Sequence, residues 1–157
     1  MFPSGQCGGP EWVKKETEEG FAPKMQKAGY KTMYMGKYMN MYGLPEAGGV
    51  EQVPAGWDSW QGLVGNSKYY NYKLSVDGIQ EDHGDNYSED YLTDLIYNRT
   101  VEFLDKRDPE KPVLMVLAPP ASHAPFTPAP QYRERFSDVK APRSALKIYI
   151  PLALQMS

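Results

Sequence analysis

Residues 29–40, GYKTMYMGKYMN, decide the fold of this chain. From Tyr30 to Met35 the side chains alternate between two sets, which is the two-residue period of a half-buried β-strand. The preceding stretch FAPKMQKAG, residues 21–29, predicts a short helix, because Pro23 is tolerated in a first turn and Gly29 stands where a helix ends. A helix that runs directly into a strand is the unit that builds parallel α/β sheets.

A second strand is predicted at residues 112–118, PVLMVLA, whose unbroken apolar run is typical of a strand buried on both faces. A helix is predicted before it, over residues 88–107, with Ser88 as the expected N-cap and with Lys106 and Arg107 suited to the C-terminal end. One stripe of this helix is apolar and comprises Leu92, Leu95, Ile96 and Phe103. The order of the elements therefore predicts the α/β class with a mostly parallel central sheet.

Lys37 and His123 follow these two strands, Lys37 directly after Gly36 and His123 in the Pro-rich stretch 119–130. In open α/β sheets the ligand crevice lies at the carboxyl ends of the strands. Lysine offers a point charge with three donors and histidine an N–H donor, so together they would form a cationic site for a tetrahedral anion. Each residue also has a structural alternative. Lys37 would then be a surface lysine at the end of a strand, and His123 a loop histidine that is hydrogen-bonded to the backbone.

The segment between the two strands contains less regular sequence. Residues 41–66 have no sustained period and are interrupted by Pro and Gly, which predicts a long irregular loop of the kind that is often functional. Residues 68–82, KYYNYKLSVDGIQED, predict a hairpin that turns at Asp77-Gly78. The Tyr and Trp positions within 57–72 are candidates for shaping a sugar pocket, and the alternative is an ordinary place in the core and its rim.

Two further motifs contain reactive residue types but favour structural roles. EDHGDN, residues 81–86, holds several metal-ligand types in a compact run, yet it lies between a polar hairpin and a capped helix, so a solvated turn is expected. Cys7 lies in GQCGGPEW, where no neighbouring histidine or helix start would activate the thiol. A single cysteine also forms no internal disulfide, so it leaves the redox compartment open.

Length and charge restrict the partners. The chain has 157 residues, the length of one domain, and a net charge of -3 with scattered basic residues, so neither nucleic acid nor an acidic membrane is an expected partner. No apolar run approaches the ~20 residues of a membrane span, and the first residues lack a signal-peptide pattern. Asn86 and Asn98 begin the glycosylation acceptors NYS and NRT, which matter only in a secreted chain. The sequence predicts no oligomeric state.

Several blocks of the sequence resemble the sulfatases, and within them the N-acetylglucosamine-6-sulfatases, with the extracellular heparan sulfatases as close relatives. Residues 28–43, AGYKTMYMGKYMNMYG, are similar to the sulfatase signature in which a Gly-Tyr-x-Thr strand ends in Gly-Lys. Residues 53–78, 86–96 and 123–136 are similar to consecutive blocks of the glucosamine-6-sulfatase group. The likeness covers residues 5–143, and the tail 144–157 is expected to be non-homologous.

The resemblance implies a partial sulfatase N-terminal domain of the alkaline-phosphatase-like fold at residues 5–143. It implies that Lys37 contacts the sulfate and the catalytic aldehyde hydrate, and that His123 contacts the sulfate ester. The family reaction would be hydrolysis of the 6-O-sulfate of N-acetylglucosamine in heparan or keratan sulfate, with a formylglycine nucleophile and a calcium ion that neutralises the sulfate charge. A sulfated glycosaminoglycan partner and a lysosomal or secretory location follow from the same resemblance.

The sequence departs from the family pattern at the catalytic machinery. It has no Cys-x-Pro-Ser-Arg motif and no amino-terminal aspartate pair, and residues 81–86 do not take the place of the family's later metal motif. We therefore expect an internal fragment that binds no cofactor and, alone, does not catalyse the reaction. The alternatives are a non-catalytic sulfated-glycan-binding remnant and a truncated gene product without activity. A partial sheet is also expected to expose strand edges and to be only marginally stable.

Overall fold

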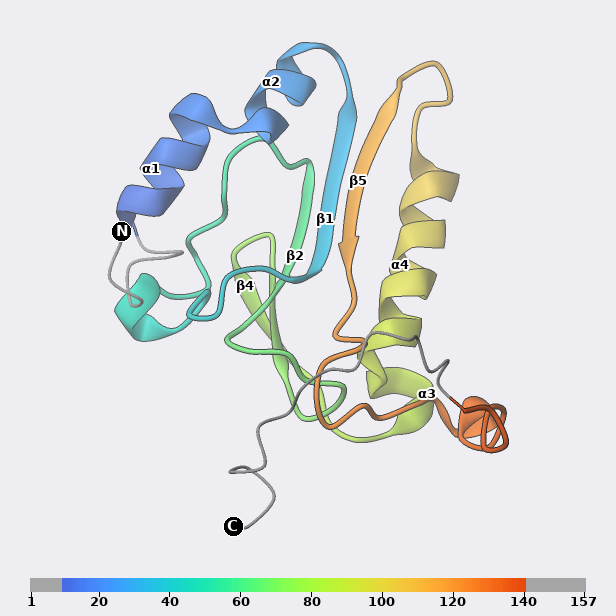
Figure 1. Cartoon of the computed structure of the whole chain (residues 1–157). Coiled ribbons are helices and arrows are strands. Elements are labelled where there is room, and N and C mark those ends of the chain that lie inside the picture. Colours follow the sequence, from blue (N-terminus) through green and yellow to red (C-terminus); the bar gives the residue numbers. More distant parts are fainter. Residues whose placement is uncertain (1–9, 141–157) are drawn as a thin grey trace, which may run out of the picture. The chain divides into compact units, whose positions relative to one another are not determined.

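The computed structural model describes residues 10–140, and its centre is a five-stranded sheet with the strand order β4-β3-β2-β1-β5 (Figure 1). Strand β1 (Lys31–Lys37) pairs in parallel with β2 (Ser59–Leu63) on one side and with β5 (Val113–Ala118) on the other. Strands β3 (Lys73–Val76) and β4 (Ile79–Asp82) add an antiparallel hairpin beside β2. The predicted α/β class with a parallel centre is confirmed.

Helices precede and follow the strands. They are α1 (Pro10–Glu19), α2 (Phe21–Lys27), α3 (Tyr87–Asp90) and α4 (Leu92–Lys106), with short 3-10 turns η1 (Pro45–Ala47) and η2 (Pro130–Tyr132). The chain divides into two compact units at residue 127, and every strand belongs to the first unit. No helix within residues 10–140 has the length and apolar character needed to cross a bilayer.

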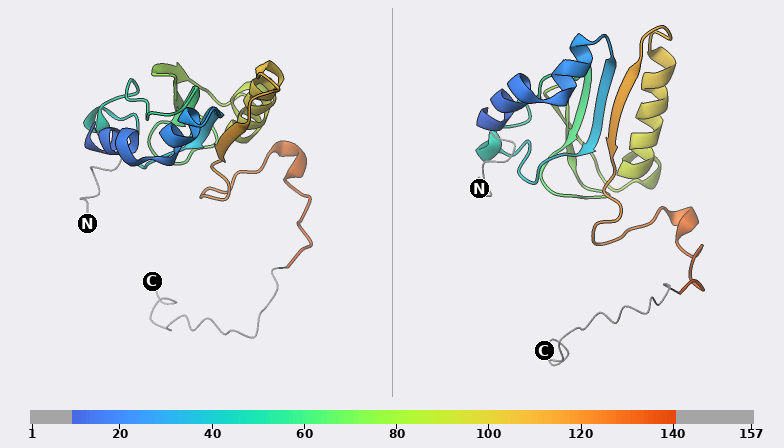
Figure 2. Two further views of the ribbon diagram at one scale, coloured as in Figure 1. Left: turned by 90° about the horizontal axis from the view of Figure 1, so that it is seen from above. Right: turned by 45° about the horizontal axis from the view of Figure 1, so that its top comes forward.

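Strand β1 sends its side chains alternately into two cores, as its sequence predicts. Met33 and Met35 are fully buried in a cluster that also receives Leu92 and Ile96 from α4. Tyr34 points to the other face, into an aromatic cluster of Tyr34, Tyr42 and Trp60, bordered by Tyr38 and Trp57. Burying one such side chain stabilises the folded state by about 1.5–3 kcal/mol. A shift of the strand by one residue would exchange the side chains of the two faces, so the alternation fixes the register of β1. Figure 2 shows α4 behind the sheet and α1 and α2 on the opposite side.

Two predictions for the middle of the chain have different outcomes. The hairpin is confirmed: Asp77 and Gly78 both have positive φ, 49° and 90°, as the tightest hairpin turn requires. The irregular loop predicted over 41–66 is wrong at its end, where β2 lies. This strand shows no alternation because it is buried between β1 and β3, and a Cβ at Gly62 would lie 2.6 Å from the Tyr42 ring.

The helix predicted over 88–107 is two helices. Tyr91 has an extended backbone that separates α3 from α4, and Ser88 is not the N-cap. The cap is Asn86, whose side chain accepts a hydrogen bond of 3.2 Å from the Ser88 N–H. The apolar stripe is confirmed, since Leu92 and Ile96 are buried in the core and Leu95 and Phe103 pack against it.

The prediction that residues 112–118 are buried on both faces is wrong. Strand β5 lies at an edge of the sheet, where β1 is its one strand neighbour among the described residues, and Leu117 is 41% exposed. An unbroken apolar run does not distinguish a central strand from an edge strand. The expectation that this edge exposes unpaired backbone stays a prediction.

Candidate anion-binding site

The site begins where three parallel strands end together. Lys37 is paired with Leu63 at the end of β2, and Gly36 with Ala118 at the end of β5. Because adjacent strands lie about 4.8 Å apart, the residues that follow them meet at one edge of the sheet. The segment carrying His123 follows β5, so the fold brings the backbone of Lys37 and the His123 loop to the same edge (Figure 1).

Gly36 allows this close approach. Its φ of +111° lies in a region that other residues rarely adopt, and a Cβ at this position would lie 2.1 Å from the Ala118 carbonyl oxygen. Only a residue without a side chain lets β1 and β5 run together at this point. The glycine before Lys37 is therefore required by the backbone that leads into the site.

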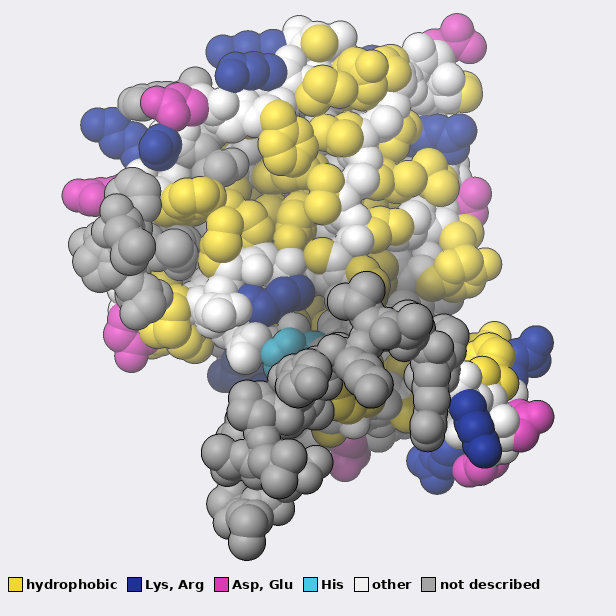
Figure 3. Space-filling view, viewed as in Figure 1, with side chains coloured by type: hydrophobic (Ala, Val, Ile, Leu, Met, Phe, Trp, Pro, Cys, Tyr) yellow, Lys and Arg dark blue, Asp and Glu magenta, His cyan; other side chains and the backbone are white. Residues whose placement is uncertain are grey.

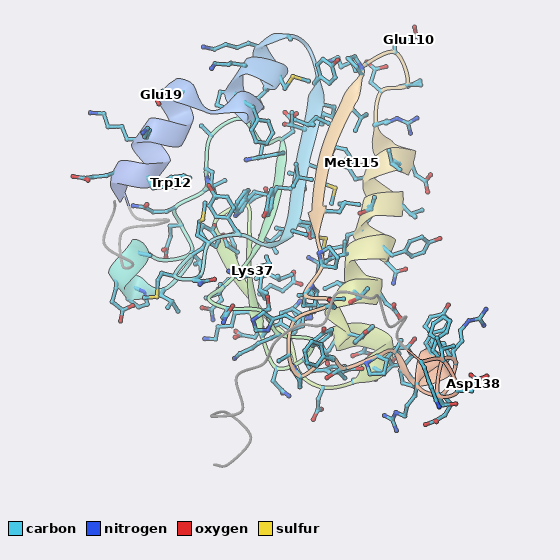
Figure 4. The ribbon with its side chains drawn as sticks, in the orientation of Figure 1. Trp12, Glu19, Lys37, Glu110, Met115 and Asp138 are labelled. Atoms are coloured by element: carbon cyan, nitrogen blue, oxygen red, sulfur yellow. The ribbon has the colours of Figure 1, made fainter. Side chains whose placement is uncertain are left out.

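Lys37 lies at the end of β1 with its side chain half-buried (Figure 4). Its Nζ donates to the Tyr38 carbonyl at 3.1 Å, and the Tyr34 hydroxyl donates to the carbonyl of Lys37 itself. Burial lowers the pKa of Lys37, because part of the water that would solvate the ammonium is excluded. An anion beside the ammonium would replace that lost solvation.

His123 lies in an exposed loop, and its ring is oriented by the backbone. Nδ1 is 2.8 Å from the Ala124 carbonyl oxygen, which can only accept, so Nδ1 carries a hydrogen and Nε2 remains for a ligand. The Lys37 and His123 side chains are thus each hydrogen-bonded to the carbonyl of the next residue, and no bond joins the two. The structure brings the end of β1 and the loop that carries His123 to one edge of the sheet, and a shared anion site of the two side chains stays a prediction.

Two buried tyrosines hold the His123 loop. The Tyr69 hydroxyl donates to the His123 carbonyl, and the Tyr91 hydroxyl donates to the Thr127 carbonyl, each at 2.9 Å. The rings of Tyr69 and Tyr91 are stacked, with centroids 6.1 Å apart. The sequence did not reveal this role, because these tyrosines lie 54 and 36 residues before the carbonyls that they bind.

The other aromatic residues within 57–72 are mostly core. Trp60 and Tyr69 are buried, and Trp57 borders the aromatic cluster. These three residues therefore belong to the core and its rim, which was the alternative to a role in a sugar pocket. Tyr72 is also buried, although it borders an open pocket of about 600 Å³ beside the ends of β2 and β4.

The solvated turn expected at residues 81–86 is wrong for His83. Its side chain is 9% exposed, stacks on Tyr72, and places Nε2 2.6 Å from Glu81 and Nδ1 3.2 Å from Asp90. Arg99 forms an ion pair with the same Glu81 carboxylate. Burial alone would raise the pKa of Glu81 and of Asp90, but their hydrogen bonds and cationic neighbours outweigh it and lower both values. The exposed Asp82, Asp85 and Asn86 fit the expectation.

A metal site needs several ligating side chains that lie close together. Between residues 10 and 140, no three His, Cys, Asp or Glu side chains come together in a way that could hold a metal ion. Cys7 lies outside the described residues. The two glycosylation candidates are both exposed: Asn86 caps α3, and Asn98 lies on α4.

Comparisons with known proteins identify the class. The family model described as Sulfatase matches residues 2–150, so this chain belongs to the sulfatase family. A solved structure, "BT4656 in complex with its substrate D-Glucosamine-2-N, 6-O-disulfate", matches 90% of this chain with a TM-score of 0.60 and 26% identity. The predicted family and the sulfatase fold are confirmed.

Among the curated relatives, the chain is 47% identical to "N-acetylglucosamine-6-sulfatase" from Homo sapiens over 141 residues, 89% of this chain. It is 38% identical to "Putative extracellular sulfatase Sulf-1 homolog" from Caenorhabditis elegans over 84% of this chain. The chain spans 26% of the human relative and 18% of the worm relative. It therefore corresponds to about a quarter or less of the length of these proteins.

Proposed function

We propose that this chain forms the sulfate-contacting part of an N-acetylglucosamine-6-sulfatase, with Lys37 and His123 as the contacting residues. The observation that carries the proposal is the convergence of the ends of β1 and β5, which brings Lys37 and the His123 loop to one edge of the sheet. The reaction is hydrolysis of the 6-O-sulfate ester of N-acetylglucosamine, in which water replaces the sugar oxygen on sulfur. The identity to N-acetylglucosamine-6-sulfatases supports this substrate.

In this proposal Lys37 and His123 bind the two ends of the ester. The Lys37 ammonium pairs with the sulfate oxygens, and its partial burial strengthens that pairing because less water competes. The His123 Nε2 donates a hydrogen bond to the ester when the ring is protonated, since Nδ1 already bonds Ala124. A formylglycine and a calcium ion supply the nucleophile and the charge neutralisation in the family, and within residues 10–140 no three His, Cys, Asp or Glu side chains gather as they would around a metal ion.

The physiological setting follows the same proposal. The partner is a sulfated glycosaminoglycan such as heparan or keratan sulfate, and the location is lysosomal or secretory. Two relatives whose names describe extracellular sulfatases support the secretory route. On that route Asn86 and Asn98 would both be accessible to glycosylation, because both side chains are exposed.

The test is calorimetric titration of the full chain with N-acetylglucosamine 6-sulfate. We expect Lys37→Ala to weaken binding about tenfold or more, the value of a charge-assisted hydrogen bond. Lys27→Ala is the matched control, because this exposed lysine ends α2, which lies before the start of β1 rather than at its end. Equal affinities for the wild-type chain and Lys37→Ala would exclude Lys37 as a sulfate contact.

A second candidate is sulfated-glycan binding without turnover. It is favoured by one observation: the only cysteine, Cys7, lies in QCGGPEW rather than in a Cys-x-Pro-Ser-Arg motif. Measuring sulfate release from the same ligand separates the two functions. Release by the chain alone supports hydrolysis, binding without release supports the binding function, and the absence of both supports a product without activity.

A further inference from the structure

An open pocket of about 600 Å³ lies at the same edge of the sheet as Lys37, displaced toward β3 and β4. Val64 continues β2 beyond the residue that pairs with Lys37, and its N–H donates to the Lys73 carbonyl at 3.0 Å. Lys73 begins β3 and is paired with Asp82, which ends β4. The pocket and Lys37 thus belong to one continuous edge within the first unit.

The lining of this pocket suits an acidic sugar. Asn40, Asn66 and Asn71 supply amides, which both donate to and accept from hydroxyl groups, and Leu44 and Val64 supply apolar surface. Lys68 and Lys73 supply two ammonium groups. Asp82 neutralises one of them, since its carboxylate lies 3.6 Å from the Lys73 Nζ. The Lys68 Nζ instead lies 3.4 Å from the Asn71 carbonyl oxygen, an uncharged partner, so its positive charge remains for an anion.

The position of the pocket fits a linked sugar. Lys37 and Lys73 lie on β1 and β3, with β2 between them, so about 10 Å separates their backbones at the usual strand spacing. That separation is comparable to the span of two linked hexose rings. A glycan whose sulfated glucosamine occupies the Lys37 site can therefore place its neighbouring sugar in the pocket.

We propose that this pocket binds the sugar adjoining the sulfated glucosamine, and that Lys68 contacts an anionic group on that sugar. The group is either a uronate carboxylate or a sulfate, because both present oxygen anions to an ammonium. This proposal rests on the proposed function, since it takes the Lys37 site as the place of the glucosamine.

The experiment compares ligands on the full chain by calorimetry. The ligands are N-acetylglucosamine 6-sulfate and three disaccharides in which that sugar is linked to a neutral hexose, a hexuronate or a sulfated hexose. We expect the acidic disaccharides to bind about tenfold more tightly than the monosaccharide. Lys68→Ala should remove this gain and leave the monosaccharide affinity unchanged, whereas Lys27→Ala should change neither. The hexuronate and sulfated arms show which anion is preferred.

The outcomes separate the two proposals. If the monosaccharide binds through Lys37 but acidic disaccharides gain nothing, the pocket proposal fails and the proposed function stands. If acidic disaccharides bind through Lys68 and Lys37→Ala has no effect, the Lys37 site fails and the pocket binds an acidic sugar independently of it, which overturns the proposed arrangement of the two sugars. If nothing binds, both fail. Asn66→Asp is a second variant, which keeps the size of the side chain and adds a negative charge to the pocket. It should weaken the binding of the acidic disaccharides and leave the binding of the neutral disaccharide unchanged.

Discussion

The Tyr69 hydroxyl donates a hydrogen bond of 2.9 Å to the carbonyl of His123, 54 residues further along the chain. Tyr69 is buried, and it stacks on Tyr91, which binds the carbonyl at the other end of the same loop. His123 itself is exposed. The loop that carries the exposed histidine is therefore held at both ends by the hydroxyl groups of buried tyrosines.

Tyr69→Phe should lower the free energy of unfolding by about 1 kcal/mol, because it removes one hydrogen bond while keeping the ring. Binding of N-acetylglucosamine 6-sulfate should weaken several-fold, since the His123 loop loses an anchor. Urea denaturation and calorimetry measure the two effects. Tyr97→Phe is the control: Tyr97 is 68% exposed, so losing its hydroxyl should change neither quantity. A Tyr69→Phe chain with unchanged affinity would show that the anchor does not position His123.

Gly36→Ala should destabilise the chain by about 3 kcal/mol or more, because strain at positive φ adds to overpacking against the Ala118 carbonyl. Gly29→Ala is a matched control, since Gly29 also has positive φ, +89°, but a Cβ at this position would have no other atom within 4 Å. It should cost only about 1 kcal/mol, the conformational strain alone. Denaturant unfolding of both variants measures the difference, and equal costs would contradict the close approach of β1 and β5.

Acid should weaken the contacts among Glu81, His83, Asp90 and Arg99. Glu81 and Asp90 have pKa values below their ordinary ones, so the stability they contribute is present above the unfolded pKa of about 4 and is lost as the pH falls through the lowered folded values. We expect the free energy of unfolding, from urea titrations, to decrease between about pH 5 and pH 3.

Glu81→Gln should make this decrease shallower, because one of the two carboxylates no longer titrates. Asp85→Asn is the control, since Asp85 is exposed and makes none of these contacts. An identical pH dependence in wild type and Glu81→Gln would show that the contacts of Glu81 with His83 and Arg99 do not contribute to acid sensitivity.

Strand β5 should unfold locally more often than β1 and β2. Within residues 10–140 it is hydrogen-bonded to a single strand, whereas β1 and β2 each have two strand neighbours. Hydrogen exchange followed by mass spectrometry should therefore find peptides covering 113–118 exchanging faster than those covering 31–37 and 59–63. Equal protection of all three would argue against the marginal stability expected of this sheet, as would a cooperative melt at an ordinary temperature.

The sequence predicts best the parts whose structure depends on neighbouring residues. The alternation in 30–35, the Asp77-Gly78 turn and the apolar stripe of α4 are local patterns, and all three are confirmed. The sequence did not predict the short strand β2, because a strand that is buried on both faces lacks the alternation of apolar and polar residues by which a strand is recognised. Unlike these patterns, the expectation that the strand ends before Lys37 and His123 lie at one edge followed from a general property of parallel sheets, and the β1–β5 pairing bears it out.

The remaining features depend on contacts between distant residues. The His83 ring stacks on Tyr72 and its Nδ1 contacts Asp90, seven residues later, and nothing in EDHGDN indicates either contact. The anchors of the His123 loop are equally distant in sequence. The pocket is lined by residues from β3, from β4 and from the segments that follow β1 and β2, so it exists only when the sheet is formed. Figure 3 shows one face of the molecule, where apolar side chains gather over the middle and upper part and charged side chains lie around them.

The pairing of Gly36 with Ala118 also has a consequence for synthesis. It joins the beginning of the described chain to its last strand, and such distant pairings form slowly because a long loop must close first. While the ribosome is still adding residues before 113, β1 has no partner on this side and the loop that carries His123 has not been made. The edge of the sheet where the proposed anion site lies is therefore completed late, after β5 has been translated and has paired with β1.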